Sequence, residues 1–196
     1  MMAKASVVTP ERFATGFTYQ DYIAQVKVNK EQFQTYYASG QLTPDDAEFF
    51  RKASQAPEGI GKILVLGEDW CPDVLRGLPV AARIAEAAGV ELRIFPRDKN
   101  PDIMNEFLNH GEFASIPVVV FYTKDLKQIC HWIERPEIAS RDLAQIQEQV
   151  KKEMPAATDQ EFRNALRQRM TGKYPEWQKA SVQEMRRMLA EKLALK

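Results

Sequence analysis

The pattern of apolar and polar positions changes at about residue 62. From there on, short β-branched apolar runs alternate with longer helical patterns. The preceding segment instead shows repeated helix-start signals, such as Thr9-Pro10 and Thr43-Pro44. A capping side chain before a proline at the first helical position is a common start of a helix. Residues 10–55 are therefore expected to form two or three short helices.

Residues 62–153 are predicted to alternate strands and helices in the order βαβαββα. The expected strands are 62–66, 91–95, 117–122 and 128–133, and the expected helices are 72–88, 100–109 and 136–153. A right-handed crossover between the first two strands would place them in one sheet. The predicted fold class is α/β, a mixed four-stranded sheet with flanking helices.

Beyond this core, two further helices are predicted. Thr158-Asp159-Gln160-Glu161 and Ser181-Val182-Gln183-Glu184 both have the form of a capping box. We divide the chain into an N-terminal helical extension (1–60), a core (61–154) and a C-terminal helical extension (155–196), together one compact domain. The C-terminal helices are expected to dock on the core or on a second copy of the chain, which would make a homodimer.

Composition and charge argue against several function classes. The 27 Lys and Arg balance the 27 Asp and Glu, so no global charge attracts nucleic acid or anionic lipid. Residues 151–196 carry 11 basic against 6 acidic side chains, but these are interleaved with an apolar pattern that indicates packing. No window approaches the apolar length of a membrane span, and residues 1–10 lack a signal-peptide core. We expect a cytoplasmic protein that binds neither nucleic acid nor membrane.

The candidate chemistry lies where the first strand meets the next helix, at Glu68-Asp69-Trp70-Cys71-Pro72-Asp73. A cysteine at a helix start is close to unpaired N–H groups and to the positive end of the helix dipole, which favour the thiolate. Pro72 would begin the helix, and Trp70 would flank the thiol. Cys71 is therefore the predicted reactive residue.

Nearby carboxylates work against that thiolate. Glu68, Asp69 and Asp73 all lie within three residues of Cys71, and like charges disfavour ionisation. Arginines could neutralise them, with Arg76, Arg97 and Arg135 as the candidates. Asp73 has two interpretations: it complements the helix dipole, or it tunes Cys71. We therefore do not expect a strongly acidified thiol.

The second cysteine is not expected to resolve the first. Strand pairing would put Cys130 opposite Val120. That position lies about 10 Å along the strand from Pro117, the residue expected below to face Cys71, whereas a disulfide needs Cα atoms within about 7 Å. His110 and His131 are more typical of a loop and a strand position than of partners for Cys71. No ligand spacing indicates a metal, and we expect no cofactor.

Three motifs together resemble a bacterial group of thioredoxin-like proteins with a single-cysteine Glu-Asp-Trp-Cys-x-Asp site. They are the Cys71 motif, Arg97-Asp98-Lys99-Asn100-Pro101, and Gly111-Glu112-Phe113-Ala114-Ser115-Ile116-Pro117. The resemblance implies a thioredoxin fold and a cis-proline at Pro117 that faces Cys71. It leaves the backbone of Ile116 to pair with an extended peptide.

The chain also departs from the dithiol members of the thioredoxin superfamily. Val74 stands where they carry a second cysteine, and the place of their buried strand acid falls at Val65 or Leu66. The resemblance therefore implies a single cysteine followed by an acid as the ordinary state of the site.

The leading hypothesis is a monothiol thiol–disulfide oxidoreductase. Cys71 would attack a protein or low-molecular-weight disulfide, and an external thiol would release it. Ile116 and Pro117 would position the substrate, with Trp70, Pro72 and Asp73 in support. One alternative is a redox-inactive binding or scaffold protein that uses the groove beside Pro117. Another is a peroxide sensor that forms a sulfenic acid at Cys71.

Overall fold

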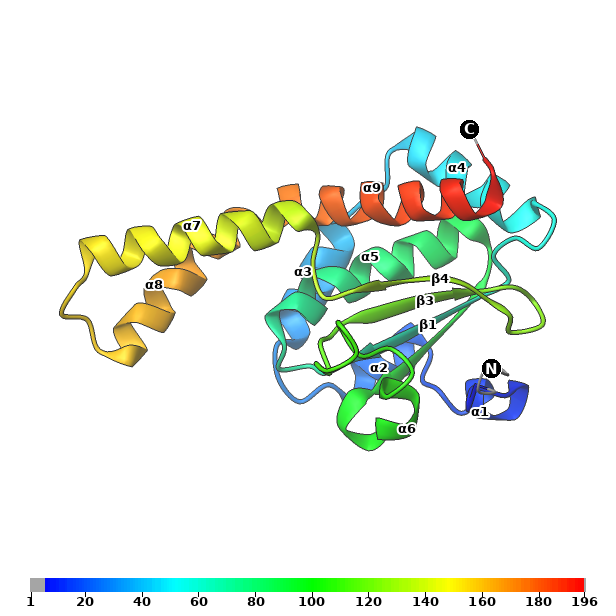
Figure 1. Ribbon diagram of the computed structural model, residues 1–196, viewed down its shortest axis with the longest axis horizontal. Coiled ribbons are helices and arrows are strands. Elements are labelled where there is room, and N and C mark those ends of the chain that lie inside the picture. Colours follow the sequence, from blue (N-terminus) through cyan, green and yellow to red (C-terminus); the bar gives the residue numbers. More distant parts are fainter. Residues whose placement is uncertain (1–5, 196) are drawn as a thin grey trace.

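A four-stranded sheet organises the chain in the computed structural model, which describes residues 6–195 (Figure 1). The strands are β1 (Lys62–Gly67), β2 (Glu91–Pro96), β3 (Val118–Tyr122) and β4 (Gln128–Ile133). Their order is β2-β1-β3-β4, with β1 parallel to β2 and antiparallel to β3, and β3 antiparallel to β4. The predicted fold class, a mixed sheet with flanking helices, is confirmed.

The helices precede, connect and follow these strands. Their bounds are α1 (Pro10–Ala14), α2 (Tyr19–Gln25), α3 (Lys30–Ser39), α4 (Pro44–Gln55), α5 (Pro72–Ala88), the 3-10 helix η1 (Arg97–Lys99), α6 (Pro101–Met104), α7 (Glu137–Glu153), α8 (Asp159–Thr171) and α9 (Tyr174–Leu193). Residues 10–55 thus hold more helices than predicted, because the chain turns between α1 and α2, where Phe17 bridges to Ile94 of β2.

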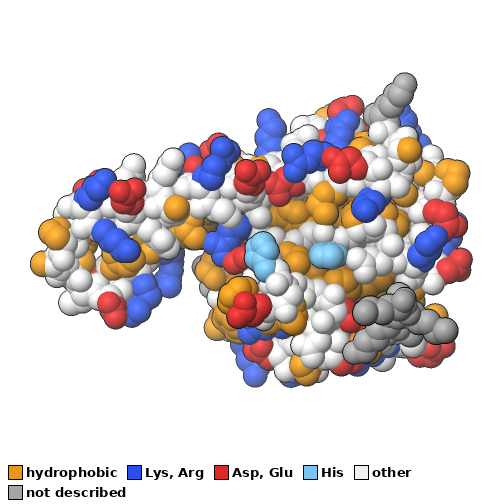
Figure 2. Space-filling view, in the orientation of Figure 1, with side chains coloured by type: hydrophobic (Ala, Val, Ile, Leu, Met, Phe, Trp, Pro, Cys, Tyr) orange, Lys and Arg blue, Asp and Glu red, His pale blue; other side chains and the backbone are white. Residues whose placement is uncertain are grey.

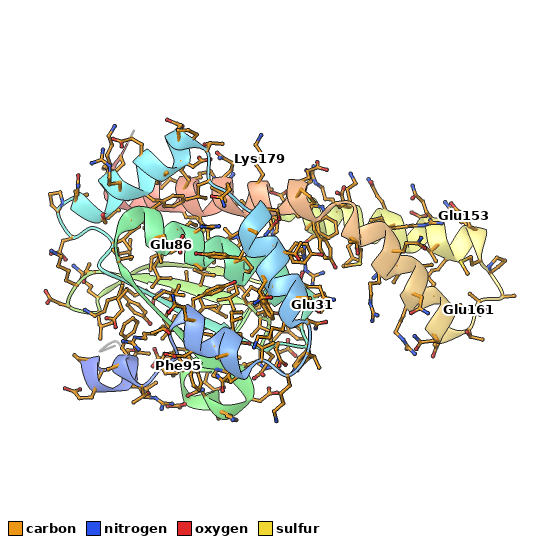
Figure 3. The ribbon with its side chains drawn as sticks, turned by 180° about the vertical axis from the view of Figure 1, so that it is seen from behind. Glu31, Glu86, Phe95, Glu153, Glu161 and Lys179 are labelled. Carbon is orange, nitrogen blue, oxygen red and sulfur yellow. The ribbon has the colours of Figure 1, made fainter. Side chains whose placement is uncertain are left out.

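The central helix α5 has the predicted bounds. Pro72 stands in its first turn, and Gly89 ends it in the left-handed conformation with φ 66°. Its apolar face is fully buried, including Val74, Leu78 and Ile84, and it contacts β1 and β2. On its other side it contacts α3, α4 and α9, and Figure 3 shows α3 crossing it. The start of α5 is therefore enclosed by elements from both ends of the chain.

One hydrophobic cluster joins the three segments into which the sequence was divided. It includes Phe50 of α4, Leu64 of β1 and Leu189 of α9, each with no exposed surface. The terminal helices therefore share the core of the sheet. Among the helices in residues 6–195, none is both long and apolar enough to cross a membrane.

Two predicted helices have other bounds than expected, and the predicted capping box at Ser181 is wrong. Ser181 lies inside α9, which begins at Tyr174, and its hydroxyl donates to the carbonyl of Trp177 at 2.9 Å. The helix expected over 100–109 is limited to α6, and the side chain of Asn100 does not cap it but donates to the Pro96 carbonyl at 2.7 Å and accepts from Arg12 at 2.8 Å. Both side chains therefore have other partners than the N–H groups of a first helical turn. The capping box at Thr158 is confirmed.

The tail divides into two parts. Helices α7 and α8 form a hairpin that extends away from the sheet, whereas α9 returns across it (Figure 1). Figure 2 shows basic and acidic side chains mixed over the projecting hairpin. Glu184 of α9 accepts hydrogen bonds from Trp132 Nε1 of β4 at 2.9 Å and from the Glu137 N–H of α7 at 2.7 Å. It therefore fastens α9 to the sheet and to the start of α7.

Candidate functional site

Cys71 occupies the turn between β1 and α5 and is the N-cap residue of α5. Its side chain is 8% exposed, and Val74, one turn later, has no exposed surface. A Cβ on Gly67 would lie 2.8 Å from Cγ1 of Val74, so the end of β1 packs directly against that valine. The position that would hold a second cysteine is thus filled by packing.

The loop before β3 faces this turn. The Ile116–Pro117 peptide bond is cis, and the Cys71 thiol donates to the Ile116 carbonyl at 3.7 Å. Gly77 of α5 permits the close approach, because a Cβ there would lie 2.7 Å from Cγ of Pro117. The structure therefore brings together Cys71, Ile116 and Pro117. The Ile116 carbonyl, expected to be free for a peptide, is instead used by the thiol.

Burial is the main influence on the thiol and raises the pKa of Cys71. The backbone N–H of Val74 opposes that shift, as do the positive charges of three arginines: Arg76, Arg135 and Arg97. Repulsion from the neighbouring carboxylates, the predicted opposing influence, is not among the main causes of this shift. The conclusion that the thiol is not strongly acidified stands, for a different physical reason.

Two of the three neighbouring carboxylates are used to hold loops together. Glu68 accepts a hydrogen bond from the Asp98 N–H at 2.8 Å, and Asp69 accepts one from the Lys27 N–H at 2.8 Å. Asn29 also donates to the Asp69 carbonyl at 2.9 Å. These bonds attach η1 and the α2–α3 loop to the turn that carries Cys71.

Asp73 forms the centre of an ion-pair cluster. Its carboxylate contacts the guanidinium groups of Arg76 and Arg135, the latter at 2.8 Å, and Arg135 also pairs with Glu134. Both Asp73 and Arg76 are largely enclosed, with side chains 12% and 4% exposed. Asp73 therefore does more than complement the helix dipole, because it links α5 to the segment after β4.

Arg76, a predicted candidate to neutralise the carboxylates near Cys71, does contact Asp73, but its aromatic partners were not predicted. Its guanidinium carbon lies 4.9 Å from the ring centre of Tyr174 and 4.7 Å from that of Trp177, both on α9. Burial lowers the pKa of Arg76 to about 10, so it stays charged at neutral pH. The three-residue spacing of Tyr174 and Trp177 indicates that they share one face of a helix, but it does not identify Arg76 as their partner.

Two large apolar side chains are exposed on loops that adjoin the thiol. Trp70 is 51% exposed and Phe113, in the loop before Pro117, is 56% exposed. Arg97 connects these loops, since its guanidinium lies 5.2 Å from the Trp70 ring centre and donates to the Ala114 carbonyl at 3.1 Å. Trp70 thus lies at the rim of the site, as predicted from its position.

Cys130 lies away from this site. It pairs with Phe121 rather than with the predicted Val120, because the ladder shifts register between Phe121 and Tyr122. The register prediction is therefore wrong by one residue, in the direction that moves Cys130 further from Pro117. Both cysteines are free, and burial raises the pKa of Cys130 to about 12.

Within the described residues, no hydrogen bond joins either histidine to Cys71. His131 on β4 lies against the ring of Phe107, with 5.4 Å between ring centres, and burial lowers its pKa. His110 lies in the loop before Ile116, with a left-handed backbone at φ 52°. Within residues 6–195, no group of three or more His, Cys, Asp and Glu is arranged to hold a metal ion.

Comparisons with known proteins agree with this architecture. A family model described as thioredoxin matches residues 16–151. A protein of unknown function from Pseudomonas aeruginosa has a similar structure, with a TM-score of 0.67 and 16% identity over 94% of this chain and 98% of that chain. An HIV epitope-scaffold gives a TM-score of 0.63 and 17% identity over 95% and 99%. At such identities these structures show a shared fold alone. No curated protein matches the chain.

Proposed function

Because the chain belongs to the thioredoxin family, we propose that it is a monothiol thiol–disulfide oxidoreductase that acts through Cys71. One observation carries this proposal: the Cys71 sulfur lies 3.7 Å from the Ile116 carbonyl, beside the cis-proline and at the start of α5. A disulfide approaching along Ile116 would thereby meet the sulfur.

The reaction consists of two exchanges. Cys71 loses its proton to solvent, and the thiolate attacks one sulfur of a substrate disulfide, so that a new S–S bond forms, the old one breaks and the other half leaves as a thiolate. An external thiolate then attacks the substrate sulfur of this mixed disulfide and releases the Cys71 thiolate. The substrate half and the external thiol end as a disulfide, so the external thiol supplies the electrons. Val74 cannot take its place.

The surrounding residues support this chemistry in different ways. The Val74 N–H and three arginines favour the thiolate, while burial disfavours it. Among hydrogen bonds in the described chain, none uses the Ile116 N–H, which leaves it for a backbone acceptor on an extended peptide. Trp70 would border that peptide. We propose a cytoplasmic site of action, a protein or low-molecular-weight disulfide as substrate, and no role for nucleic acid, membrane or cofactor.

Trapping of the mixed disulfide tests this proposal. The full chain is incubated with a disulfide-bearing peptide at several pH values, and peptide mass mapping locates the adduct. We expect an adduct at Cys71 that forms faster as the pH rises, because burial raises the pKa of this thiol. The Cys71→Ser variant is the matched control, since any remaining adduct then belongs to Cys130. A Val74→Cys variant should convert the adduct to an internal disulfide. Absence of an adduct at Cys71 at every pH would overturn the proposal.

A second function is favoured by the burial of the thiol. With 8% of Cys71 exposed and its pKa raised, the groove beside Pro117 could bind an extended peptide without exchange. Binding of a cysteine-free peptide by the parent chain and by Cys71→Ser distinguishes the two. Equal affinities together with no adduct at Cys71 would establish the binding function in place of the exchange reaction.

A further inference from the structure

A buried positive charge lies against the first turn of α5, which begins next to Cys71. Arg76 is 4% exposed, its Nε donates to the Pro72 carbonyl at 3.3 Å, and its guanidinium contacts Asp73. Burying a charge is unfavourable unless close partners compensate for lost hydration. This buried guanidinium therefore needs close partners that compensate for its lost hydration.

Helix α9 provides that support. Tyr174 and Trp177 enclose the guanidinium at 4.9 and 4.7 Å and are themselves 4% and 1% exposed. Trp177 Nε1 donates to Asp142 of α7 at 2.8 Å, and Gln178 donates to the Arg76 carbonyl at 3.3 Å. The aromatic faces stabilise the cation, and these hydrogen bonds determine where those faces stand.

The ion-pair cluster at the start of α5 is balanced in charge, because Arg76 and Arg135 face Asp73 and Glu134. Asp73 is shared by two arginines, and Arg76 has no second carboxylate among its ion pairs. Several other ionisable groups also surround the thiol. The groups that lie outside α5 are Tyr22 of α2, Glu68 and Asp69 of the β1–α5 turn, Arg97 of η1, Glu134 and Arg135 after β4, and Tyr174 of α9.

We infer that α9 completes the Cys71 site, because it holds the charge of Arg76 against the start of α5, where that charge favours the thiolate. Arg76 acts on the Cys71 thiol through its electrostatic field, so it is a positioning residue and does not itself react. The direction of its influence on the pKa of Cys71 agrees, since Arg76 lowers it against the effect of burial. The functional importance of this charge rests on the proposed exchange reaction, but its effect on the pKa of Cys71 can be measured on the thiol alone.

The rate of alkylation of Cys71 against pH, followed by peptide mass mapping of the full chain, tests the inference. Arg76→Met should slow alkylation at about pH 7.5 roughly three- to tenfold and move the profile to higher pH. Arg76→Lys should restore most of the rate, because it restores the charge. Arg83→Met is the matched control: Arg83 also lies on α5, with its guanidinium 3.7 Å from the Tyr37 ring centre, and should leave the profile unchanged.

A folded Arg76→Met variant with the parent profile would overturn the inference. Should that variant fail to fold, the double variant Arg76→Met/Asp73→Asn is compared with Asp73→Asn, since the two proteins differ only in the charge of Arg76. Alkylation should be slower in the double variant, and equal rates would refute the inference. The mixed-disulfide assay reports separately, so a failed exchange reaction and a failed charge effect are distinguishable.

Discussion

The last two helices of the chain, α8 and α9, differ in what they contact. Helix α9 buries seven residues and contacts α4, α5, α7 and β4, whereas α8 buries none and packs beside α7. Both helices are amphipathic and both carry basic residues. A helical pattern therefore predicts that a helix is present, whereas the role of that helix depends on which surface lies opposite.

The largest effect is expected at the aromatic anchor of α9. Trp177→Ala should lower the free energy of unfolding by about 3–5 kcal/mol, because it removes a fully buried ring that also holds Arg76. Chemical denaturation followed by circular dichroism measures this loss. A change under about 1 kcal/mol would mean that α9 is no better anchored than α8.

A smaller effect is expected where α9 meets α4. Burial alone would raise the pKa of Asp46, but hydrogen bonds from Thr43, Arg186 and Gln183 hold it below its usual value. A carboxyl whose pKa is lowered on folding stabilises the folded state at pH values above its ordinary pKa of 3.8. That stabilisation is lost as the pH falls through the lower pKa of the folded state.

Asp46→Asn should therefore lower the free energy of unfolding by about 1–3 kcal/mol at neutral pH and flatten its decline toward about pH 3. Denaturation midpoints measured over this range provide the check. An equally steep decline in the variant would show that other carboxyls govern the acid response.

The smallest effect on stability is expected in α8. Leu166 is half-buried on a helix that contacts only α7 extensively, so Leu166→Ala should cost less than about 1 kcal/mol. The same denaturation measurement applies. A loss as large as that of Trp177→Ala would remove the contrast between the two helices.

A homodimer through the C-terminal helices stays a prediction, with α8 as its expected contact because none of its residues is buried. Light scattering should then give about twice the 22.4 kDa of one chain. Leu166→Glu should yield the monomer while leaving thermal unfolding of the monomer unchanged. A parent chain that is monomeric at high concentration contradicts this prediction.

Several features of the site could be predicted because their determinants are close in sequence. The apolar run before Gly67 and the proline after Cys71 are local signals, and α5 has the predicted bounds from Pro72 to Ala88. The position of Ile116–Pro117 opposite Cys71 came from the resemblance, since no local pattern specifies it.

Other features could not be predicted because they depend on distant contacts. The register of Cys130 depends on an irregularity in the ladder, and the role of Ser181 depends on where α9 begins. The environment of Arg76 depends on residues about 100 positions away. The sequence around Cys71 therefore indicates the neighbouring carboxylates, but not the burial that dominates the pKa of the thiol.

Three features follow from the amino-acid sequence alone: a single thiol at a helix start, the α/β order of the core and a valine at position 74 in place of a resolving cysteine. Contacts between distant segments bury the thiol, share Asp73 between two arginines and enclose Arg76 against α9. The physical reason is that helix starts and strands follow from neighbouring residues, whereas desolvation and electrostatic fields depend on everything that packs around a group.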